Sequence, residues 1–307
     1  MTMFKTLNIF RATGLPDINA LEYALCTNEF APCSPSQDKS CGWIEPRGED
    51  NGALVESIGG QWLLKFAVET KSVPGAIVRE KADAEAKAIE QTTGRKPGKK
   101  ETKQLREDAL LALLPQAFPK RSAVLVWIDP IRGVIYTDSA SAPKDDAVIT
   151  ALVQAMPNLQ MRYVQPVLSP QTAMTGWLTQ DAEYWPEGFN VERACELKSA
   201  DEEKSVVKFN RHNVNTDEIR KHIAEGKLPV NLAMSFDGRV GFTLTDNLRL
   251  KKIAFLDGVV RDEGDADSFD ADFTLATGEL SRFVPSLLIA LGGEVPVADD
   301  GLFGSED

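Results

Sequence analysis

Alternating hydrophobic and polar positions predict short strands in both halves of the chain. Asp129-Pro-Ile-Arg132 and Asp237-Gly238 each separate two such runs by a tight turn, so we expect antiparallel hairpins there. The remaining runs are expected to extend the same sheets. The predicted strands cover residues 6–12, 61–68, 122–128, 133–137, 161–167, 206–209, 230–236, 240–245 and 250–256.

Helical patterns occupy fewer segments. Asp17 opens a short helix that runs through Leu25, and Pro285 is expected to kink the closing helix 277–291. Further helices are predicted at 144–156 and 216–225. Residues 31–60 are rich in Pro, Gly, Ser and acids and read as a loop with Trp43 as its apolar anchor. Since strands and helices do not alternate regularly, we predict an α+β fold of antiparallel sheets with flanking helices.

One segment differs in character from the rest. Residues 76–93 and 99–114 are rich in Ala, Glu, Lys and Leu, which favour helix. Gly94-Arg-Lys-Pro-Gly98 separates them and ends the first helix. We therefore predict a projecting antiparallel helical hairpin. The expected division of the chain is a first α+β half (1–75 and 122–170), the basic hairpin with its base (76–121), and a second α+β half (171–307).

Charge is distributed unevenly along the 307 residues, whose formal net charge is -12. Residues 71–121 carry a balance of +5, against -4 before them and -13 after them. A basic region in an acidic protein can direct one surface toward phosphate; a solvated, Lys-rich helix pair is the alternative. No run approaches the ~20 apolar residues of a membrane span, and no signal peptide is evident. We expect a cytoplasmic protein.

Motifs of enzymes and metal centres are missing from the sequence. Cys26, Cys33, Cys41 and Cys195 form no C-x-x-C pair, and His212 and His222 lie far from the first three. This spacing favours free thiols over a zinc site. No phosphate loop, dinucleotide fingerprint or nucleophile elbow occurs. We therefore expect no catalytic residue, no metal and no cofactor.

The acidic run from Asp262 to Asp272 provides the best argument for an enzyme. Asp265, Asp267, Asp270 and Asp272 could hold the metal ions of a nuclease. A calcium loop is excluded, because Asp270 replaces the turn glycine and Ala276 the bidentate Glu. The default expectation is a solvated acidic loop before a strand at 273–276.

The segment Leu113-Leu-Pro-Gln-Ala-Phe118-Pro-Lys-Arg121 is the most distinctive candidate site. An aromatic ring between two prolines can wedge against bases while Lys120 and Arg121 neutralise phosphates. The alternative is that Phe118 packs into the core where hairpin meets body. Two further basic groups could extend a cationic surface or merely face solvent. They are Lys208-Phe-Asn-Arg211-His212, and Arg220, Lys221 and Lys227.

Several of these stretches together resemble the bacterial RdgC family of recombination-associated proteins. The likeness covers nearly the whole chain, and its strength is the shared order of pieces that are individually weak. The main pieces are Phe30-Ala-Pro-Cys33, Gly42-Trp43, Leu113-Leu-Pro-Gln-Ala-Phe118, Trp127-Ile-Asp129, Asp138-Ser-Ala-Ser-Ala142, Glu196-Leu-Lys-Ser199, His222-Ile-Ala-Glu-Gly-Lys227, Phe269-Asp-Ala-Asp-Phe273 and Leu291-Gly-Gly-Glu294.

The resemblance implies a nucleoid-associated, ring-shaped homodimer that encloses duplex DNA without reading its sequence and restrains RecA-promoted strand exchange. It places the family's aromatic finger at Phe118 and its basic-polar pair at Arg211 and His212, where Lys-Gln is more usual. It makes the hairpin one of two dimer contacts. Two alternatives remain open: the metal-dependent nuclease, and a regulator that contacts RecA without DNA.

Overall fold

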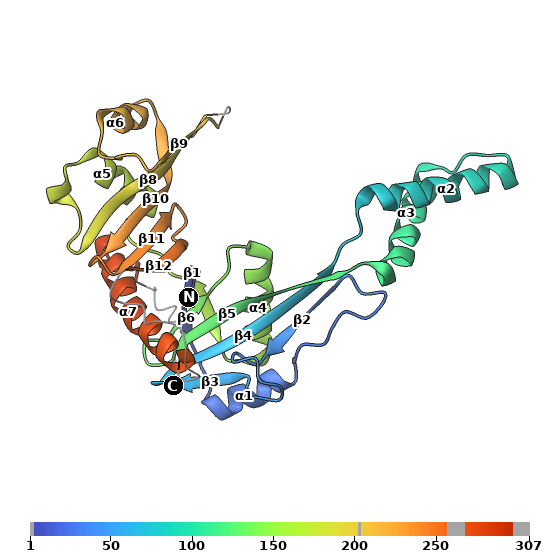
Figure 1. Cartoon of the computed structure of the whole chain (residues 1–307), viewed down its shortest axis with the longest axis horizontal. Coiled ribbons are helices and arrows are strands. Elements are labelled where there is room, and N and C mark those ends of the chain that lie inside the picture. The colour runs from blue at the N-terminus through green and yellow to red at the C-terminus, as the bar shows by residue number, and fades with distance from the viewer. Residues whose placement is uncertain (1–2, 202–203, 257–267, 297–307) are drawn as a thin grey trace, which may run out of the picture.

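The computed structural model describes residues 3–201, 204–256 and 268–296. In Figure 1 the molecule is bent like an open crescent. Strands β8–β12 with α5–α7 form one arm, and the helical hairpin α2–α3 forms the other. Strands β1–β6 with α1 and α4 form the base between them, with long strands β4 and β5 extending to the hairpin. The α+β class is therefore confirmed.

Antiparallel pairing joins the described strands into one twelve-stranded sheet. Its main order is β2-β4-β5-β6-β1-β12-β11-β10-β8-β9, with β3 beside β4 and β7 beside β1. The strands are β1 (Thr6–Thr13), β2 (Lys39–Ile44), β3 (Val55–Ile58), β4 (Gln61–Lys71), β5 (Pro119–Asp129), β6 (Val134–Thr137), β7 (Gln160–Tyr163), β8 (Phe189–Ser199), β9 (Val206–Asn210), β10 (Lys227–Phe236), β11 (Val240–Thr245) and β12 (Leu250–Phe255).

Strand β1 joins the two parts of the sheet. Residues 8–11 pair with β6, whereas only Thr6 and Leu7 pair with β12 of the second half. Few backbone hydrogen bonds therefore join the two parts of the sheet. Arg249 reinforces it from the second half, since its side chain donates to Asn8 Oδ1 at 2.5 Å and lies 3.5 Å from the buried carboxylate of Asp145.

Helices α1 (Ile18–Cys26) and α4 (Ala142–Ala155) cover the first part of the sheet. Asp17 caps α1 as predicted, because its carboxylate accepts from the backbone N–H groups of Asn19 and Ala20. Leu21 and Leu25 of α1 and Leu152 of α4 enter a core with strand residues such as Phe66. Among the helices of the described residues, none has the length and apolar character needed to cross a bilayer.

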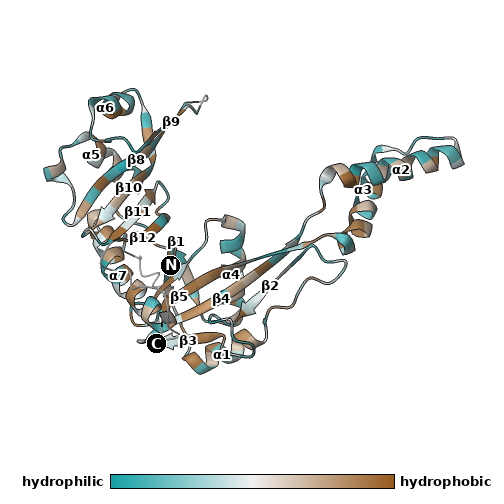
Figure 2. Cartoon of the chain, viewed as in Figure 1, coloured by the Kyte–Doolittle hydropathy of each residue, from teal (hydrophilic) through white to brown (hydrophobic). Residues whose placement is uncertain are grey.

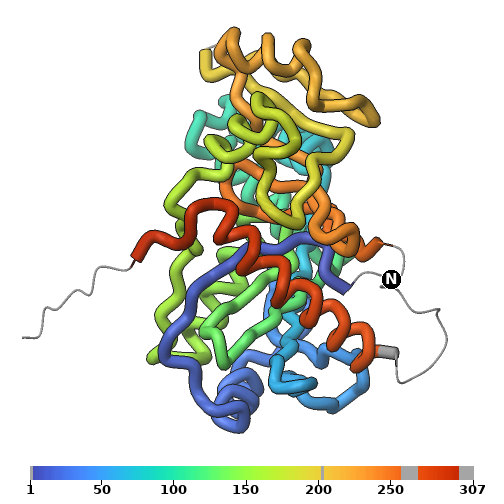
Figure 3. The backbone as a smooth tube through the Cα atoms, turned by 90° about the vertical axis from the view of Figure 1, so that its left-hand side faces the viewer, coloured from blue at the N-terminus to red at the C-terminus, as the bar shows by residue number. Residues whose placement is uncertain are grey.

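Helices α5 (Pro170–Thr179), α6 (Asp217–Ala224) and α7 (Ser268–Ala290) pack on the second part of the sheet. Helix α7 crosses strands of both halves in Figure 3. Its Phe283 lies 4.5 Å from the ring of Phe242 in β11, and its Phe273 lies 6.3 Å from Phe4, beside β1. This core is therefore shared between the two predicted halves; the division into domains stays a prediction.

Three predictions about elements were wrong. Residues 273–276 are helical, because α7 begins at Ser268 and buries Phe273 and Ala276 on one face. The expected loop 31–60 contains β2 and β3, and Trp43 is fully buried on β2. The strand expected at 161–167 ends at Tyr163. Strand β8 and helix α5 were not predicted; register shifts between β8 and β10 break the alternation that would have revealed β8.

The hairpin α2 (Gly75–Thr93) and α3 (Lys99–Leu113) confirms the prediction almost to the residue. Gly94 ends α2 in the left-handed region, with φ of 72°, where a glycine carries no steric penalty. Within the hairpin helices, only Ala82 and Ala109 are buried. The colouring of Figure 2 shows its polar tip and the apolar positions nearer the body. Ile77, Leu110 and Leu111 are exposed there.

Candidate nucleic-acid interface

Phe118 projects from the base of the hairpin. The short helix η1 (Leu114–Gln116) follows α3, and Leu114 is buried while Phe118 is 93% exposed. Pro115 lies within this turn and Pro119 begins β5, so the backbone is rigid on both sides of the exposed Phe118. The interpretation that the ring packs into the core is wrong. A large apolar side chain presented to solvent is instead available to stack on a ligand.

Lys120 and Arg121, which follow Pro119, differ in their surroundings. Both lie on β5 and are exposed, but Arg121 Nη2 lies 3.1 Å from Glu69 Oε2 on β4. The Arg121 guanidinium also stacks 4.4 Å from the centre of the Phe30 ring. A hydrogen bond from the Cys33 backbone N–H, together with Arg121, lowers the pKa of Glu69. Arg121 therefore has an ion-pair partner within the chain, so its charge is less available to an external phosphate than the charge of Lys120.

The second predicted group lies at the far arm of the crescent. Lys208 on β9 is 61% exposed and pairs with Glu196 on β8 at 3.3 Å. Arg211 and His212 follow β9 and are exposed, and Arg211 has a φ of 55°. Arg193 holds this turn, since it donates to the Arg211 carbonyl and its own carbonyl accepts from the His212 N–H, both at 3.1 Å.

Lys227 and its neighbours are less accessible than the sequence indicated. Lys227 lies just after α6, as expected, and begins β10; its side chain is 17% exposed, and its Nζ lies 3.9 Å from Glu225. Arg220 contacts Asp181 at 3.1 Å. Phosphate contacts by Arg220 or Lys227 would first have to displace carboxylates of the chain itself, whereas Lys221 is exposed on α6.

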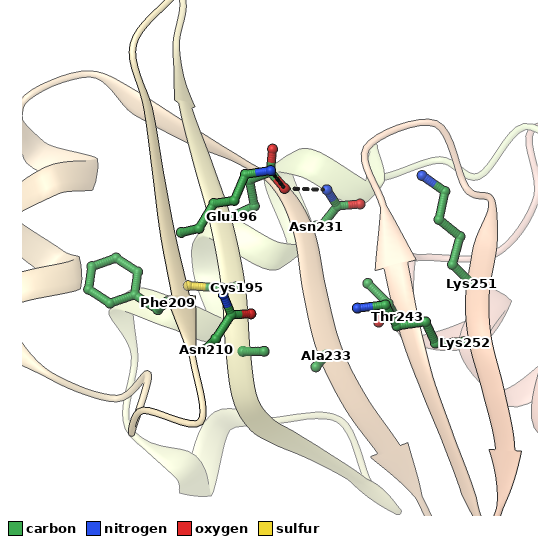
Figure 4. Close-up of a pocket in the computed structure, with 11 residues that line it drawn as sticks. Cys195, Glu196, Phe209, Asn210, Asn231, Ala233, Thr243, Lys251 and Lys252 are labelled. Atoms are coloured by element: carbon green, nitrogen blue, oxygen red, sulfur yellow. Dashed lines mark hydrogen bonds and ion pairs between the residues drawn. The ribbon is translucent and has the colours of Figure 1, made fainter.

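The open face of β8–β12 carries cations that the sequence reasoning missed. Helices α5, α6 and α7 pack on its other face, where Leu232, Met234 and Phe242 are buried. Figure 4 shows Asn231, Thr243, Lys251 and Lys252 lining a hollow of about 250 Å³ on the open face. Glu196 is also there, already paired with Lys208. The Lys251-Lys252 dipeptide within a predicted strand was the signal that could have identified this site.

The acidic run does not assemble a nuclease site in the described residues. Asp265 and Asp267 lie outside them. Asp270 and Asp272 are two positions apart on α7 and so point to different sides of the helix. Asp270 also pairs with Arg47 at 2.5 Å. The structure as far as it is described contains no group of three or more His, Cys, Asp or Glu side chains suited to a metal.

Cys195 is buried on β8, and burial raises the pKa of its thiol to about 12. The thiol therefore stays protonated and unreactive at neutral pH. Cys26, Cys33 and Cys41 are also free. These thiols add no chemistry to the open face.

Comparison with known proteins assigns the chain to a family. A family model described as "Putative exonuclease, RdgC" matches residues 2–294. The recombination-associated protein RdgC of Dechloromonas aromatica is 39% identical, over 95% of this chain and 98% of its own length. Those of Cupriavidus necator and Herminiimonas arsenicoxydans are 40% and 39% identical, with the same coverage of both chains. The chain belongs to the RdgC family of recombination-associated proteins.

Proposed function

We propose that this protein binds double-stranded DNA without sequence preference, without cutting it, and thereby restrains RecA-dependent recombination at the nucleoid. The observation that carries the proposal is the exposed Phe118 beside Lys120. An aromatic ring next to a cation is a combination used to contact bases and phosphates together. The relatives' name, recombination-associated protein, agrees with a DNA ligand.

The crescent shape supports a ring-shaped homodimer around the duplex. Two crescents that meet at both ends would enclose a hole lined by the open sheet face. The hairpin would form one contact, since Ile77, Leu110 and Leu111 are exposed on it. Burial of these side chains against a second copy would stabilise the closed form through the hydrophobic effect.

Binding to duplex DNA is tested by fluorescence anisotropy with two unrelated sequences across a salt series. We expect equal affinities, and a logarithm of the binding constant that falls linearly with the logarithm of salt, because phosphate neutralisation releases counterions. Absence of binding at low salt would exclude the proposal. A strong preference for one sequence would exclude its non-specific character.

The family model's description makes exonuclease activity worth a direct test. End-labelled linear duplex, incubated with Mg²⁺ or Mn²⁺ and the protein, is expected to keep its length. Shortening of the duplex that Asp270→Ala abolishes would instead establish the nuclease. Restraint of RecA is tested by strand exchange with excess competitor duplex: relief by the competitor supports action through DNA, and unchanged inhibition supports direct contact with RecA.

Removal of the Glu69 charge is expected to strengthen DNA binding. In Glu69→Gln the amide oxygen can still accept from the Cys33 N–H, but Arg121 loses its carboxylate partner. The freed guanidinium then adds about one phosphate contact, which steepens the salt slope by about 0.9. Anisotropy checks this, with Glu80→Gln as the control, because Glu80 is exposed on α2 and forms no ion pair among the described residues. A slope equal to wild type would show that Arg121 does not reach the duplex.

A further inference from the structure

A β-bulge on β12 brings two consecutive lysines to one face of the sheet. Gly241 pairs with Ala254 and Thr243 with Lys251, so the single residue Phe242 faces both Lys252 and Ile253. In a regular strand, successive side chains point to opposite faces. The bulge interrupts this alternation, and Lys251 and Lys252 line the same hollow beside Thr243.

Lys252 adopts a backbone conformation that is unfavourable for its residue type. Its φ is 52°, in the left-handed region that glycine occupies without steric cost. Such conformations persist only where the surroundings hold them, and they are frequent at functional sites. A glycine would relieve the strain, yet the chain carries a lysine there. The backbone conformation by itself favours glycine at this position, so it does not account for the lysine.

A third lysine joins the pair from the segment just before β1. Thr6, the first residue of β1, pairs with Lys251, and Lys5 directly precedes Thr6. Lys5, Lys251 and Lys252 together line a second hollow of about 460 Å³, and Lys251 and Lys252 line both hollows. The Asp138 carboxylate holds the Lys5 segment by accepting from the backbone N–H groups of Lys5 and Thr6, at 3.3 and 2.8 Å.

The three ammonium groups keep their charge available. No carboxylate oxygen of the described residues lies within 4.0 Å of the Nζ atoms of Lys5, Lys251 or Lys252. Glu196, the acid that lines the first hollow, is engaged by Lys208 at 3.3 Å and by the Asn231 amide at 3.2 Å. The first hollow is also lined by the neutral donors Asn231 and Thr243. Glu192, farther along the face, accepts a hydrogen bond from Ser235 at 2.7 Å. The surface therefore favours an extended anion.

We propose that Lys5, Lys251 and Lys252 form a backbone-binding tract for duplex DNA where the β8–β12 arm joins the base of the crescent. This inference rests on the proposed function and adds to it a contact separate from Phe118. Three lysines spread over two open hollows suit a row of phosphates better than one small anion. Lysine is a flexible point charge that neutralises phosphate without reading bases, which fits binding without sequence preference.

The test compares salt slopes of single variants with equal changes in charge. Lys251→Gln and Lys252→Gln are each expected to reduce the slope by up to about 0.9, and the double variant by up to about 1.8. Arg282→Gln on α7, a helix packed on the opposite face of the sheet, is the matched control and is expected to keep the wild-type slope. Lys252→Arg, which retains the charge, is expected to keep it too.

A second variant separates the charge from the bulge. Lys252→Gly suits the positive φ, so it should fold like wild type and still lose the same slope as Lys252→Gln. If wild type binds duplex and Lys251→Gln and Lys252→Gln both retain its slope, the tract is excluded while DNA binding stands. If wild type does not bind at all, the proposed function itself fails, so the two failures are distinguishable.

Discussion

Phe118→Ala is expected to weaken duplex binding about tenfold or more while leaving thermal stability unchanged. Loss of a stacked aromatic side chain costs about 1–3 kcal/mol per base, and 1.4 kcal/mol corresponds to tenfold in affinity. Stability should not change, because the ring is 93% exposed and has almost no packing to lose. Anisotropy with one duplex and a thermal melt of the free protein measure the two quantities.

The salt series distinguishes this loss from a loss of charge. Phe118 carries no charge, so the variant should bind with a lower affinity and an unchanged slope. Ile131→Ala is the matched control, since Ile131 is an apolar side chain 85% exposed in the turn after β5. Phe118→Trp should retain stacking and affinity. Wild-type affinity in Phe118→Ala would contradict the assignment of this ring to the DNA interface.

Phe283→Ala is expected to destabilise the fold by about 3–5 kcal/mol, the usual cost of removing a buried aromatic ring. Phe283 is fully buried on α7, and its ring centre lies 6.2, 5.7 and 4.5 Å from those of Phe189, Phe236 and Phe242. The change leaves a cavity where three strands meet the helix. At about 2–4 °C per kcal/mol for a chain of this size, the melting temperature should fall by about 10 °C.

Calorimetry or circular dichroism checks this value. Ile289→Ala in the same helix is the control, because Ile289 is 76% exposed and a surface substitution usually changes stability by less than about 0.5 kcal/mol. An equal melting temperature for Phe283→Ala and wild type would show that α7 does not hold the second half of the sheet in solution.

Local sequence patterns were sufficient for elements that fold on local rules. The hairpin α2–α3 follows from helix-forming residues on both sides of Gly94, and α1 from its cap at Asp17. Strand β2 could not be found in this way, since its sequence KSCGWI has few apolar residues and is a strand through its pairing with β4. The start of α7 was missed because residues 262–272 are acidic, although Phe269 and Phe273 follow a helical spacing.

The candidate site was predictable only in part, for a physical reason. The two prolines that flank Phe118 predicted a rigid turn. Whether the Phe118 ring faced the core or the solvent depended on tertiary packing, and Leu114 occupies the buried position instead. Charge counting treated Arg121, Lys227 and Lys120 alike. In the structure Arg121 pairs with Glu69 and Lys227 pairs with Glu225. The shared face of Lys251 and Lys252 could not be predicted, because regular strand alternation places successive side chains on opposite faces. The bulge on β12 brings these two side chains to the same face.

The placement of α7 has a consequence for synthesis on the ribosome. Phe4 and Trp127, from the first half of the chain, lie in the core that α7 closes, and Phe273 of α7 contacts Phe4. The apolar face of the first half therefore has no native cover until α7 has left the exit tunnel. Exposed apolar surface of this kind attracts chaperones or other nascent chains, so productive folding of the first half waits for α7.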